Sequence, residues 1–206
     1  MNAKEAEYVV FDVETTGLSA VGGDRMVEIA AVKVKERKII DTFESFINPE
    51  RPIPIEAQKV NNITEDMLKD APTRDIVLPK MLDFIGGACV AGHNVKFDLN
   101  FLCLELSLIG RRLHDDTPAV DTLKLARRFI PHLTSHRLSN VAHFLGTPIE
   151  ETHRALADVK LTVDILNCLL DMAAEQKIET LGDVFKEFGV DKPKFKIKQA
   201  EQEMLF

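Results

Sequence analysis

The chain has 206 residues, of which 45% are hydrophobic and 29% are charged, and its formal net charge is −7. This composition fits one globular domain with a full core and a small appendage. No apolar run reaches the roughly 18 residues that a membrane helix needs, and residues 1–7 do not resemble a signal peptide. The acidic balance argues against tight non-specific binding to long duplex nucleic acid, because such binders usually carry a basic excess.

The three cysteines, Cys89, Cys103 and Cys168, are odd in number and lie in apolar contexts. They indicate small buried thiols in a reducing compartment rather than a disulfide framework. We therefore expect a cytoplasmic protein.

The first expected element is a buried strand near the start of the chain. Residues 8–18, YVVFDVETTGL, are rich in β-branched and aromatic residues and break at Gly17. Residues 26–49 follow with an apolar alternation that predicts two strands around a polar turn near Glu36–Lys38. The Pro-rich segment 51–64 is expected to be irregular, and Pro79 is expected to interrupt or open the next apolar run.

Helices and short strands alternate in the rest of the chain. Periodicity and terminal glycines predict helices over 78–87, 97–110, 136–146, 154–176 and 180–189, a strand over 88–94, and a strand turning into a helix over 118–131. This order predicts a mixed α/β sheet covered by helices. We divide the chain into one domain, 1–176, and a short helix with a C-terminal tail, 177–206.

Two acids in the first strand are unusual. Asp12 and Glu14 are two residues apart, so their side chains point to the same face of the strand. An unpaired buried charge is costly unless it is neutralised or binds a cation. The pair therefore predicts either a bound cation or a bound proton.

Further acids stand near the expected starts of helices. Asp98 follows the short strand, where it either caps a helix or serves a site. His153 precedes Asp158 by five residues, about 140° around a helix, so His153 must lie at or before the helix start if the two are to converge. Taken alone, His153 fits a surface position better than a site.

Together these residues resemble a known family. Asp12-Val-Glu14-Thr-Thr-Gly-Leu, Asn94-Val-Lys-Phe97-Asp98 and His153-(four residues)-Asp158 are similar, in order and spacing, to the three motifs of the DEDD exonuclease superfamily. The histidine of the third motif is typical of the DEDDh (DnaQ-like) branch. That branch includes the proofreading epsilon subunit of bacterial DNA polymerase III and the exonuclease domain of PolC-type polymerases. The resemblance covers about residues 7–175.

The resemblance implies an α/β ribonuclease H-like fold, with a five-stranded mixed sheet of three antiparallel N-terminal strands and then parallel strands, flanked by helices. It implies a bacterial, cytoplasmic 3′–5′ exonuclease that removes nucleoside monophosphates from single-stranded or mismatched 3′ ends of DNA in proofreading or repair. Two divalent ions, Mg²⁺ or Mn²⁺, would be held by four carboxylates, since such oxygens are their preferred ligands. The implied metal ligands are Asp12, Glu14, Asp98 and Asp158, with His153 as the general base.

The same resemblance implies a pocket for the terminal nucleotide. The backbone around Thr15, Thr16 and Gly17 would bind sugar and phosphate, with Gly17 allowing close approach. Leu18 would wedge beside the terminal base, and His93, Asn94 and Phe97 would surround it. The alternatives are that Phe97 belongs to the core and that His93 bonds a loop carbonyl.

The C-terminal residues form a separate motif. This motif resembles the peptide by which bacterial repair and replication proteins dock on the sliding clamp. Its residues are Gln202, Met204, Leu205 and Phe206. The apolar residues would fill a pocket while Gln202 bonds its rim. The alternative is that Leu205 and Phe206 pack on the domain. A clamp tether would compensate for the weak electrostatic grip of an acidic enzyme on DNA.

Other functions are weighed against this one. An RNA substrate within the same family stays open, because the metal site does not read the sugar 2′-hydroxyl. A catalytically silent clamp or polymerase adaptor would have lost one of the five catalytic residues, and none is lost. A haloacid-dehalogenase phosphatase also opens with a strand ending in Phe-Asp, but here the second acid is Glu14 and no catalytic lysine motif stands out.

Overall fold

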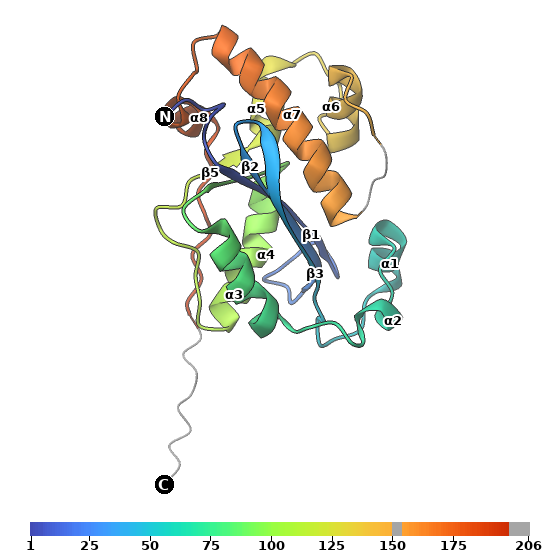
Figure 1. Ribbon diagram of the computed structural model, residues 1–206. Helices are drawn as coiled ribbons and strands as arrows, with labels where there is room; N and C mark the ends of the chain where they lie inside the picture. Colours follow the sequence, from blue (N-terminus) through green and yellow to red (C-terminus); the bar gives the residue numbers. More distant parts are fainter. Residues whose placement is uncertain (150–153, 198–206) are drawn as a thin grey trace.

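A central five-stranded sheet organises the molecule, a computed structural model that describes residues 1–149 and 154–197 (Figure 1). The strand order is β3-β2-β1-β4-β5. The strands are β1 (Tyr8–Thr15), β2 (Met26–Lys35), β3 (Lys38–Phe46), β4 (Cys89–Gly92) and β5 (Ala119–Asp121).

The first three strands form an antiparallel meander. β2 pairs antiparallel with both β1 and β3. The β2–β3 turn is made by Glu36 and Arg37, whose φ angles are 48° and 68°. Two successive positive φ angles are typical of the tight turn whose twist matches a hairpin. The predicted hairpin and its turn are therefore confirmed.

The other two strands are parallel to β1. β4 pairs with β1 and β5 pairs with β4, both in parallel register. The helices that connect and cover them are α3 (Arg74–Ile85), α4 (Val95–Leu108), α5 (Thr122–Phe129), α6 (Leu138–Leu145), α7 (Ala155–Glu175) and α8 (Leu181–Phe188). Three antiparallel strands followed by parallel ones, with helices on both faces, confirm the predicted fold class.

The alternation of β1 assigns its side chains to the two faces of the sheet. Tyr8 and Val10 belong to the core cluster under α5, α6 and α7. Val9, Phe11 and Val13 belong to the cluster under α3 and α4. Even-numbered positions of β1 therefore face the α7 layer, and this parity also orients the acids at the end of the strand.

Segment 51–64 is not irregular, as the proline content had suggested. It contains α1 (Ile55–Asn61), and α2 (Glu65–Leu68) follows it. Pro54 is the N-cap of α1, a place where a missing N–H costs no intrahelical bond. The helix expected from residue 78 begins earlier, at Arg74, and continues through Pro79. Pro54 marks a helix start and Pro79 lies within a helix, so the assumption that proline breaks helices made the prediction wrong here.

The residues after α7 pack on the same domain. Val184 and Phe188 of α8 belong to the core cluster on the α7 side of the sheet. The N–H of Val190 donates to the Ala119 carbonyl (2.9 Å), and the Lys192 ammonium donates to three loop carbonyls at 2.5–2.8 Å. A boundary after residue 176 stays a prediction. Among the described residues, none of the helices is long and apolar enough to span a membrane.

Candidate active site

Asp12 and Glu14 lie at the carboxyl end of β1. Both occupy even positions of the strand, so their side chains project toward the α7 layer. Opposite them on β2 are Ala30 and Glu28, and the pairing becomes irregular between Glu14 and Thr15. The sequence prediction that the two acids share a face therefore agrees with the strand geometry.

Asp158 reaches the same place from the other side. It lies in the first turn of α7, the helix that covers this face of the sheet. One carboxylate oxygen each from Asp12, Glu14 and Asp158 lies within 4.8 Å of the others. A strand end and a helix start thus bring together three acids that are far apart in the sequence.

Asp98 approaches from α4 and is held by the backbone of β1. Its Oδ1 accepts the N–H of Val13 at 3.2 Å, and the residue is only 3% exposed. This N–H is free because β4 pairs with β1 only as far as Val10. The early end of β4 therefore opens an edge of β1 to a carboxylate. Asp12, Glu14, Asp98 and Asp158 are called the carboxylate cluster below.

The charges of the cluster repel one another in a buried setting. Burial is the main cause that raises the pKa of Asp12 well above its ordinary value, and the charges of Asp98, Glu14 and Asp158 raise it further. Burial also raises the pKa of Asp98, against the lowering effect of the Val13 N–H. The pKa of Glu14 rises to about 7, because of burial first and then Asp158 and Glu28, while Arg154 opposes the shift. Protons or cations must therefore balance this site.

The donor set fits divalent cations that prefer oxygen. It consists of carboxylates alone, and a Mg²⁺ or Mn²⁺ ion prefers such hard ligands. The oxygens of Asp12, Glu14 and Asp158 already converge within the span of one coordination shell. A bound cation would attract these carboxylates and so offset their mutual repulsion. The residues present therefore fit the divalent ions that the sequence implied.

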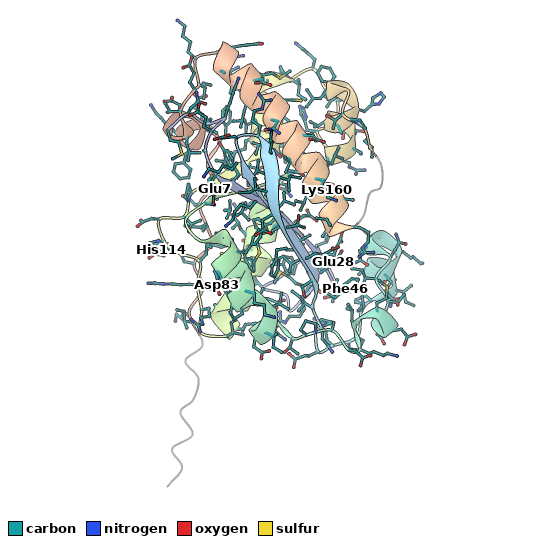
Figure 2. The ribbon with its side chains drawn as sticks, viewed as in Figure 1. Glu7, Glu28, Phe46, Asp83, His114 and Lys160 are labelled. Carbon is teal, nitrogen blue, oxygen red and sulfur yellow. The ribbon has the colours of Figure 1, made fainter. Side chains whose placement is uncertain are left out.

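Glu28 is a fifth acid beside the cluster, and sequence reasoning missed it. It is 1% exposed and lies opposite Glu14 on β2. Its Oε1 accepts from the Arg154 guanidinium at 2.8 Å, and its Oε2 accepts the N–H of Ala155 at 3.2 Å. Figure 2 shows Glu28 next to Phe46, whose ring lies 5.3 Å from the Arg154 guanidinium. The same reasoning that singled out Asp12, an acid within an apolar strand, would have found it.

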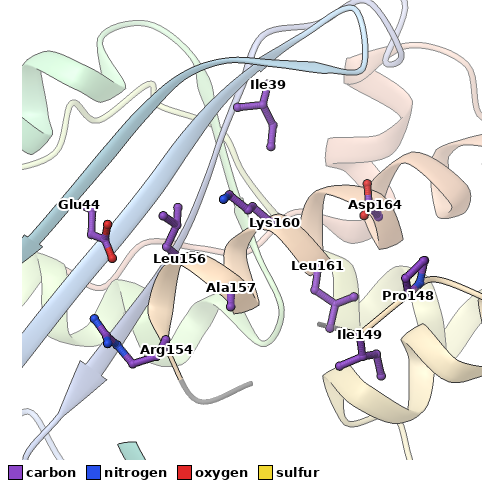
Figure 3. Close-up of a pocket in the computed structure, with 10 residues that line it drawn as sticks. All are labelled: Ile39, Glu44, Pro148, Ile149, Arg154, Leu156, Ala157, Lys160, Leu161 and Asp164. Carbon is purple, nitrogen blue, oxygen red and sulfur yellow. The ribbon is translucent and has the colours of Figure 1, made fainter. Parts of the chain in front are cut away.

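Arg154 also borders a groove that is separate from the cluster (Figure 3). This groove of about 740 Å³ runs between β3 and α7, with Ile39 and Glu44 on one side and Leu156, Lys160 and Asp164 on the other. None of the four acids of the cluster lines it. We therefore place the candidate active site at the cluster and not in this groove.

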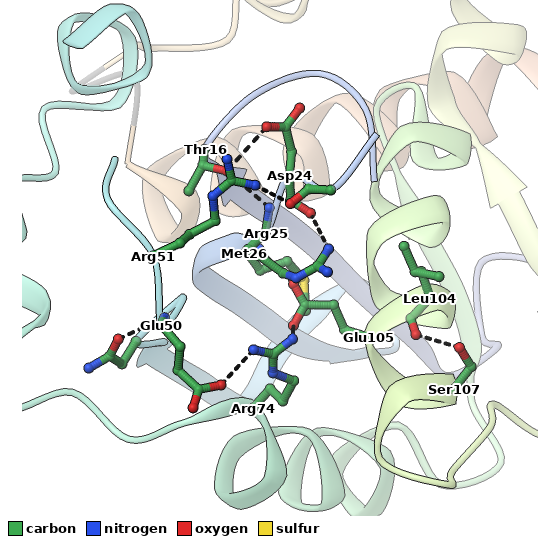
Figure 4. Close-up of polar contacts among 12 residues, drawn as sticks. Thr16, Asp24, Arg25, Met26, Glu50, Arg51, Arg74, Leu104, Glu105 and Ser107 are labelled. Atoms are coloured by element: carbon green, nitrogen blue, oxygen red, sulfur yellow. Dashed lines mark hydrogen bonds and ion pairs between the residues drawn. The ribbon is translucent and has the colours of Figure 1, made fainter. Parts of the chain in front are cut away.

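The loop after β1 is held by polar contacts (Figure 4). The N–H of Thr16 donates to the Arg25 carbonyl (2.8 Å), and the N–H of Arg25 donates back to the Thr16 hydroxyl (3.0 Å). Glu105, 1% exposed in α4, accepts the N–H of Met26 at 2.8 Å and lies 3.8 Å from Arg74. The loop that carries the predicted nucleotide-binding residues is therefore braced from β2, α3 and α4.

Gly17 is required by its own loop. A Cβ at this position would lie 2.4–2.6 Å from the carboxylate of Asp24, which accepts the N–H of Ser19 at 3.0 Å. Thr15 donates its hydroxyl to the Gly17 carbonyl at 2.6 Å. Leu18 follows, 87% exposed, at the surface. The expected close approach of Gly17 to a nucleotide stays a prediction.

The predicted nucleotide-binding residues near the start of α4 make different kinds of contact. Asn94 is the N-cap of α4 in a left-handed conformation (φ 65°), and its N–H donates to Asp121 (2.9 Å). Phe97 is partly buried and packs 5.1 Å from the Phe101 ring. His93 bonds the Thr122 hydroxyl and the His136 carbonyl through its two ring nitrogens. The described contacts of His93 and Phe97 are internal, and their contact with a nucleotide stays a prediction.

Two sets of predicted residues lie outside the described part of the chain. These are His153, the predicted base, and the predicted clamp-binding residues Gln202, Met204, Leu205 and Phe206. α7 begins at Ala155, in keeping with the requirement that residue 153 precede the helix.

The fold and the carboxylate cluster define an α/β protein of the ribonuclease H-like class with an acidic site whose carboxylates fit a divalent cation. Residues 9–166 match the RNase T exonuclease family, and the chain belongs to this family of exonucleases.

Known proteins that resemble the chain support this assignment. It is 40% identical over 180 residues to the PolC-type DNA polymerase III of Caldanaerobacter subterraneus and 39% identical over 186 residues to that of Bacillus subtilis. These matches cover 87% and 90% of this chain but 13% of each relative, so the chain spans about an eighth of the length of those polymerases.

Solved structures show the same architecture. Exonuclease X in complex with 5′ overhanging duplex DNA is 26% identical, with a TM-score of 0.69, and the match covers 87% of this chain and 98% of that one. Exonuclease I of E. coli in complex with a dT13 oligonucleotide is 17% identical, with a TM-score of 0.73, over 84% of this chain and 42% of that one. The second likeness shows the fold alone.

Proposed function

We propose that the chain is a 3′–5′ exonuclease that removes nucleoside monophosphates from single-stranded or mismatched DNA ends in the bacterial cytoplasm, in proofreading or repair. The observation that carries this proposal is the carboxylate cluster, in which Asp12, Glu14 and Asp158 converge while Asp98 is held at Val13. Membership of the exonuclease family and the likeness to PolC-type polymerases support it.

The four acids would hold two divalent ions, Mg²⁺ or Mn²⁺. By the resemblance to the DEDD exonucleases, Asp12 would contribute to holding both ions. Glu14 and Asp158 would bind the ion on the side of the attacking water, and Asp98 would act on the second. Bound there, the ions would supply a more acidic water and would offset charge on the phosphodiester oxygens.

His153 would take the proton from the attacking water. An imidazole with an ordinary pKa near 6.5 is largely neutral at cellular pH and is therefore available as a base. The rate should rise with pH through this ionisation and then level off. His153→Ala should lower the rate by about 100-fold or more at neutral pH. Full activity of that variant would contradict the assignment.

The pocket of the terminal nucleotide would be formed by two segments, the loop after β1 and the start of α4. Its residues are Thr15, Thr16, Gly17, Leu18, His93, Asn94 and Phe97. The exposed position of Leu18 suits contact with a base, since a side chain that is 87% exposed has no packing role to lose. An apolar wedge beside an unstacked base is tolerant of sequence. This agrees with an enzyme that degrades any 3′ end.

Polarity and sugar preference need matched substrates. An oligonucleotide labelled at its 5′ end should give a descending ladder, whereas the same strand labelled at its 3′ end should release labelled mononucleotide first. DNA and RNA strands of the same sequence, with paired and mismatched ends, would then rank the substrates. Early release of a 5′-terminal label would refute the polarity, and a faster RNA rate would favour an exoribonuclease.

We propose two protein partners, a DNA polymerase and the sliding clamp. The polymerase rests on the PolC-type relatives, and the clamp rests on Gln202, Met204, Leu205 and Phe206. Deleting 202–206 should leave cleavage of short oligonucleotides unchanged and abolish clamp pull-down. Undiminished clamp binding by the truncated protein would refute the clamp proposal while leaving the nuclease intact.

A further inference from the structure

A second hollow lies beside the start of α4. It has a volume of about 580 Å³ and is lined by residues of three segments, namely His93, Asn94, Leu123, Arg127, Thr134, Ser135, His136, Arg137 and Leu138. No member of the carboxylate cluster is among them. Among the residues that the structure describes, the lining contains two arginines and no acid, in a chain whose net charge is −7.

The hollow lies close to the carboxylate cluster along one helix. Asn94 lines the hollow and is the N-cap of α4, and Asp98 is four residues further along the same helix. Four residues correspond to a rise of about 6 Å. A strand that presents its end to Asp98 therefore brings a neighbouring nucleotide within reach of the hollow.

The wall of the hollow is fixed by internal hydrogen bonds. His93 uses Nδ1 with the Thr122 hydroxyl (3.0 Å) and Nε2 with the His136 carbonyl (2.7 Å). His136 in turn bonds the Ile130 carbonyl through its own Nε2 (3.0 Å). The bond from His93 to the His136 carbonyl holds the loop that precedes α6. Burial lowers the pKa of His93 and so disfavours its charged form. Positive charge in the hollow comes from the arginines.

Arg127 and Arg137 are available to a ligand. Both are exposed, and neither forms an ion pair with any residue that the structure describes. Asp121 is the acid whose charge raises the pKa of His93, against the effect of burial. Its carboxylate accepts the N–H groups of Asn94 and Leu123 (2.9 Å each). In contrast, Arg37, Arg74 and Arg154 are each paired with a carboxylate. Two unpaired guanidinium groups in one hollow suit a phosphate, which they can bind bidentately.

We propose that this hollow binds a phosphodiester of the substrate strand upstream of the bond that is cleaved. Arg127 and Arg137 contact its non-bridging oxygens, and Thr134 and Ser135 offer hydroxyl donors beside them. The contact grips the backbone without reading bases, as a non-specific exonuclease requires. The proposal rests on the proposed nuclease function and adds to it a site that sets the length of strand required for tight binding.

The test compares substrates with and without an upstream phosphate. The p-nitrophenyl ester of thymidine 5′-monophosphate has none, and oligo-dT strands of two to ten nucleotides have an increasing number. The double variant Arg127→Ala/Arg137→Ala should raise KM for the longer strands about tenfold or more, with little change in kcat. Its activity on the nitrophenyl ester should change less than twofold. The salt dependence of oligo-dT binding should become shallower by about 1 to 1.5 in log–log slope.

Arg128→Ala is the matched control. Arg128 lies on the same helix as Arg127, but its guanidinium lies 5.9 Å from the Phe129 ring and does not line the hollow. An equal KM change in Arg128→Ala, equal losses on the ester and the strands, or an unchanged KM in the double variant would each overturn the proposal. If the wild-type protein cleaves neither substrate, the proposed nuclease function fails. In that case, binding of a fluorescent dT strand still tests whether the hollow binds a phosphodiester. The double variant should bind the strand at least about tenfold more weakly than Arg128→Ala.

Discussion

Glu28 and Arg154 form an ion pair of 2.8 Å that joins β2 to the start of α7. Glu28 is 1% exposed, and the same carboxylate also accepts the first backbone N–H of the helix, that of Ala155 (3.2 Å). One acid thus supplies both a counter-charge and a helix cap. Asp158 lies in the first turn of that helix, so the pair helps to fix where this proposed metal ligand stands relative to Glu14.

Glu28→Gln should lower stability and turnover together. The amide keeps the shape but leaves the Arg154 charge without its partner, so we expect a loss of about 1–3 kcal/mol in the free energy of unfolding. Displacement of Asp158 should reduce kcat by about tenfold or more while KM changes little. Denaturant unfolding and steady-state kinetics measure the two effects.

Arg37→Ala serves as the control for Glu28→Gln. Arg37 pairs with Asp171 near the other end of α7, and both side chains are exposed. Such surface pairs contribute about 0–1 kcal/mol, so this variant should stay close to wild type in both measurements. Equal effects of the two substitutions would show that Glu28 has no special bearing on Asp158.

Asp12→Asn should remove both catalysis and the response to metal. In wild type, Mn²⁺ or Mg²⁺ should raise Tm, because an ion that binds only the folded state stabilises it by about 2.7 kcal/mol at 100 times Kd. Chelation should reverse the shift and stop cleavage. The variant should lose activity by about 1000-fold and show a much smaller metal-induced change in Tm, which thermal melts would report. Glu175→Gln, at the far end of α7, should keep both properties, and an Asp12→Asn protein that still cleaves would contradict the ligand assignment.

The metal-free protein should lose stability as pH rises from about 5 to 7.5. Glu14 has a pKa of about 7 in the folded protein, above its ordinary value of 4.5, because of burial and then Asp158 and Glu28. The folded state therefore holds a proton that the unfolded state has released in this window, and stability falls with rising pH. Asp12 and Asp98 shift in the same direction. Unfolding in the presence of a chelator, measured at several pH values, gives the slope.

Glu14→Gln should flatten that slope and stabilise the metal-free protein at pH 7.5 by about 1–2 kcal/mol, since it removes one of the repelling charges. The gain should come with a loss of activity, as expected where a functional site stores unfavourable charge. A variant that is less stable than wild type at pH 7.5, with the slope unchanged, would show that Glu14 is balanced by the protein itself.

Gly17→Ala should distort the loop after β1. The added methyl group would lie 2.4 Å from an Asp24 oxygen, so the Asp24 carboxylate must move aside and its hydrogen bond with the Ser19 N–H is disturbed. We expect a loss of about 1–2 kcal/mol and a higher KM. Asp24→Ala removes the obstructing carboxylate, and the double variant should be less impaired than the sum of the two single variants. Simple additivity would point to a direct contact between Gly17 and substrate.

The resemblance to the exonuclease family predicted the arrangement of the strands. The two-residue period of a strand predicted the shared face of Asp12 and Glu14. The sequence did not predict the bond between Asp98 and the Val13 N–H, since that depends on where β4 stops pairing with β1. Glu28 could have been singled out as an acid within an apolar strand, but its ion pair with Arg154 could not be predicted, because the two residues are distant in the sequence. α1 was missed because a proline at a helix cap looks, in sequence, like any other proline.

The carboxylate cluster is assembled from both ends of the chain, and this has a consequence for biosynthesis. Asp12 and Glu14 lie on the first strand to be made, whereas Asp158 lies on a helix that is made late. The cluster is therefore incomplete until α7 has docked on the sheet. A nascent chain lacks some of these acids and a partly folded chain has not brought them together, so the proposed hydrolytic activity would arise only with the finished fold.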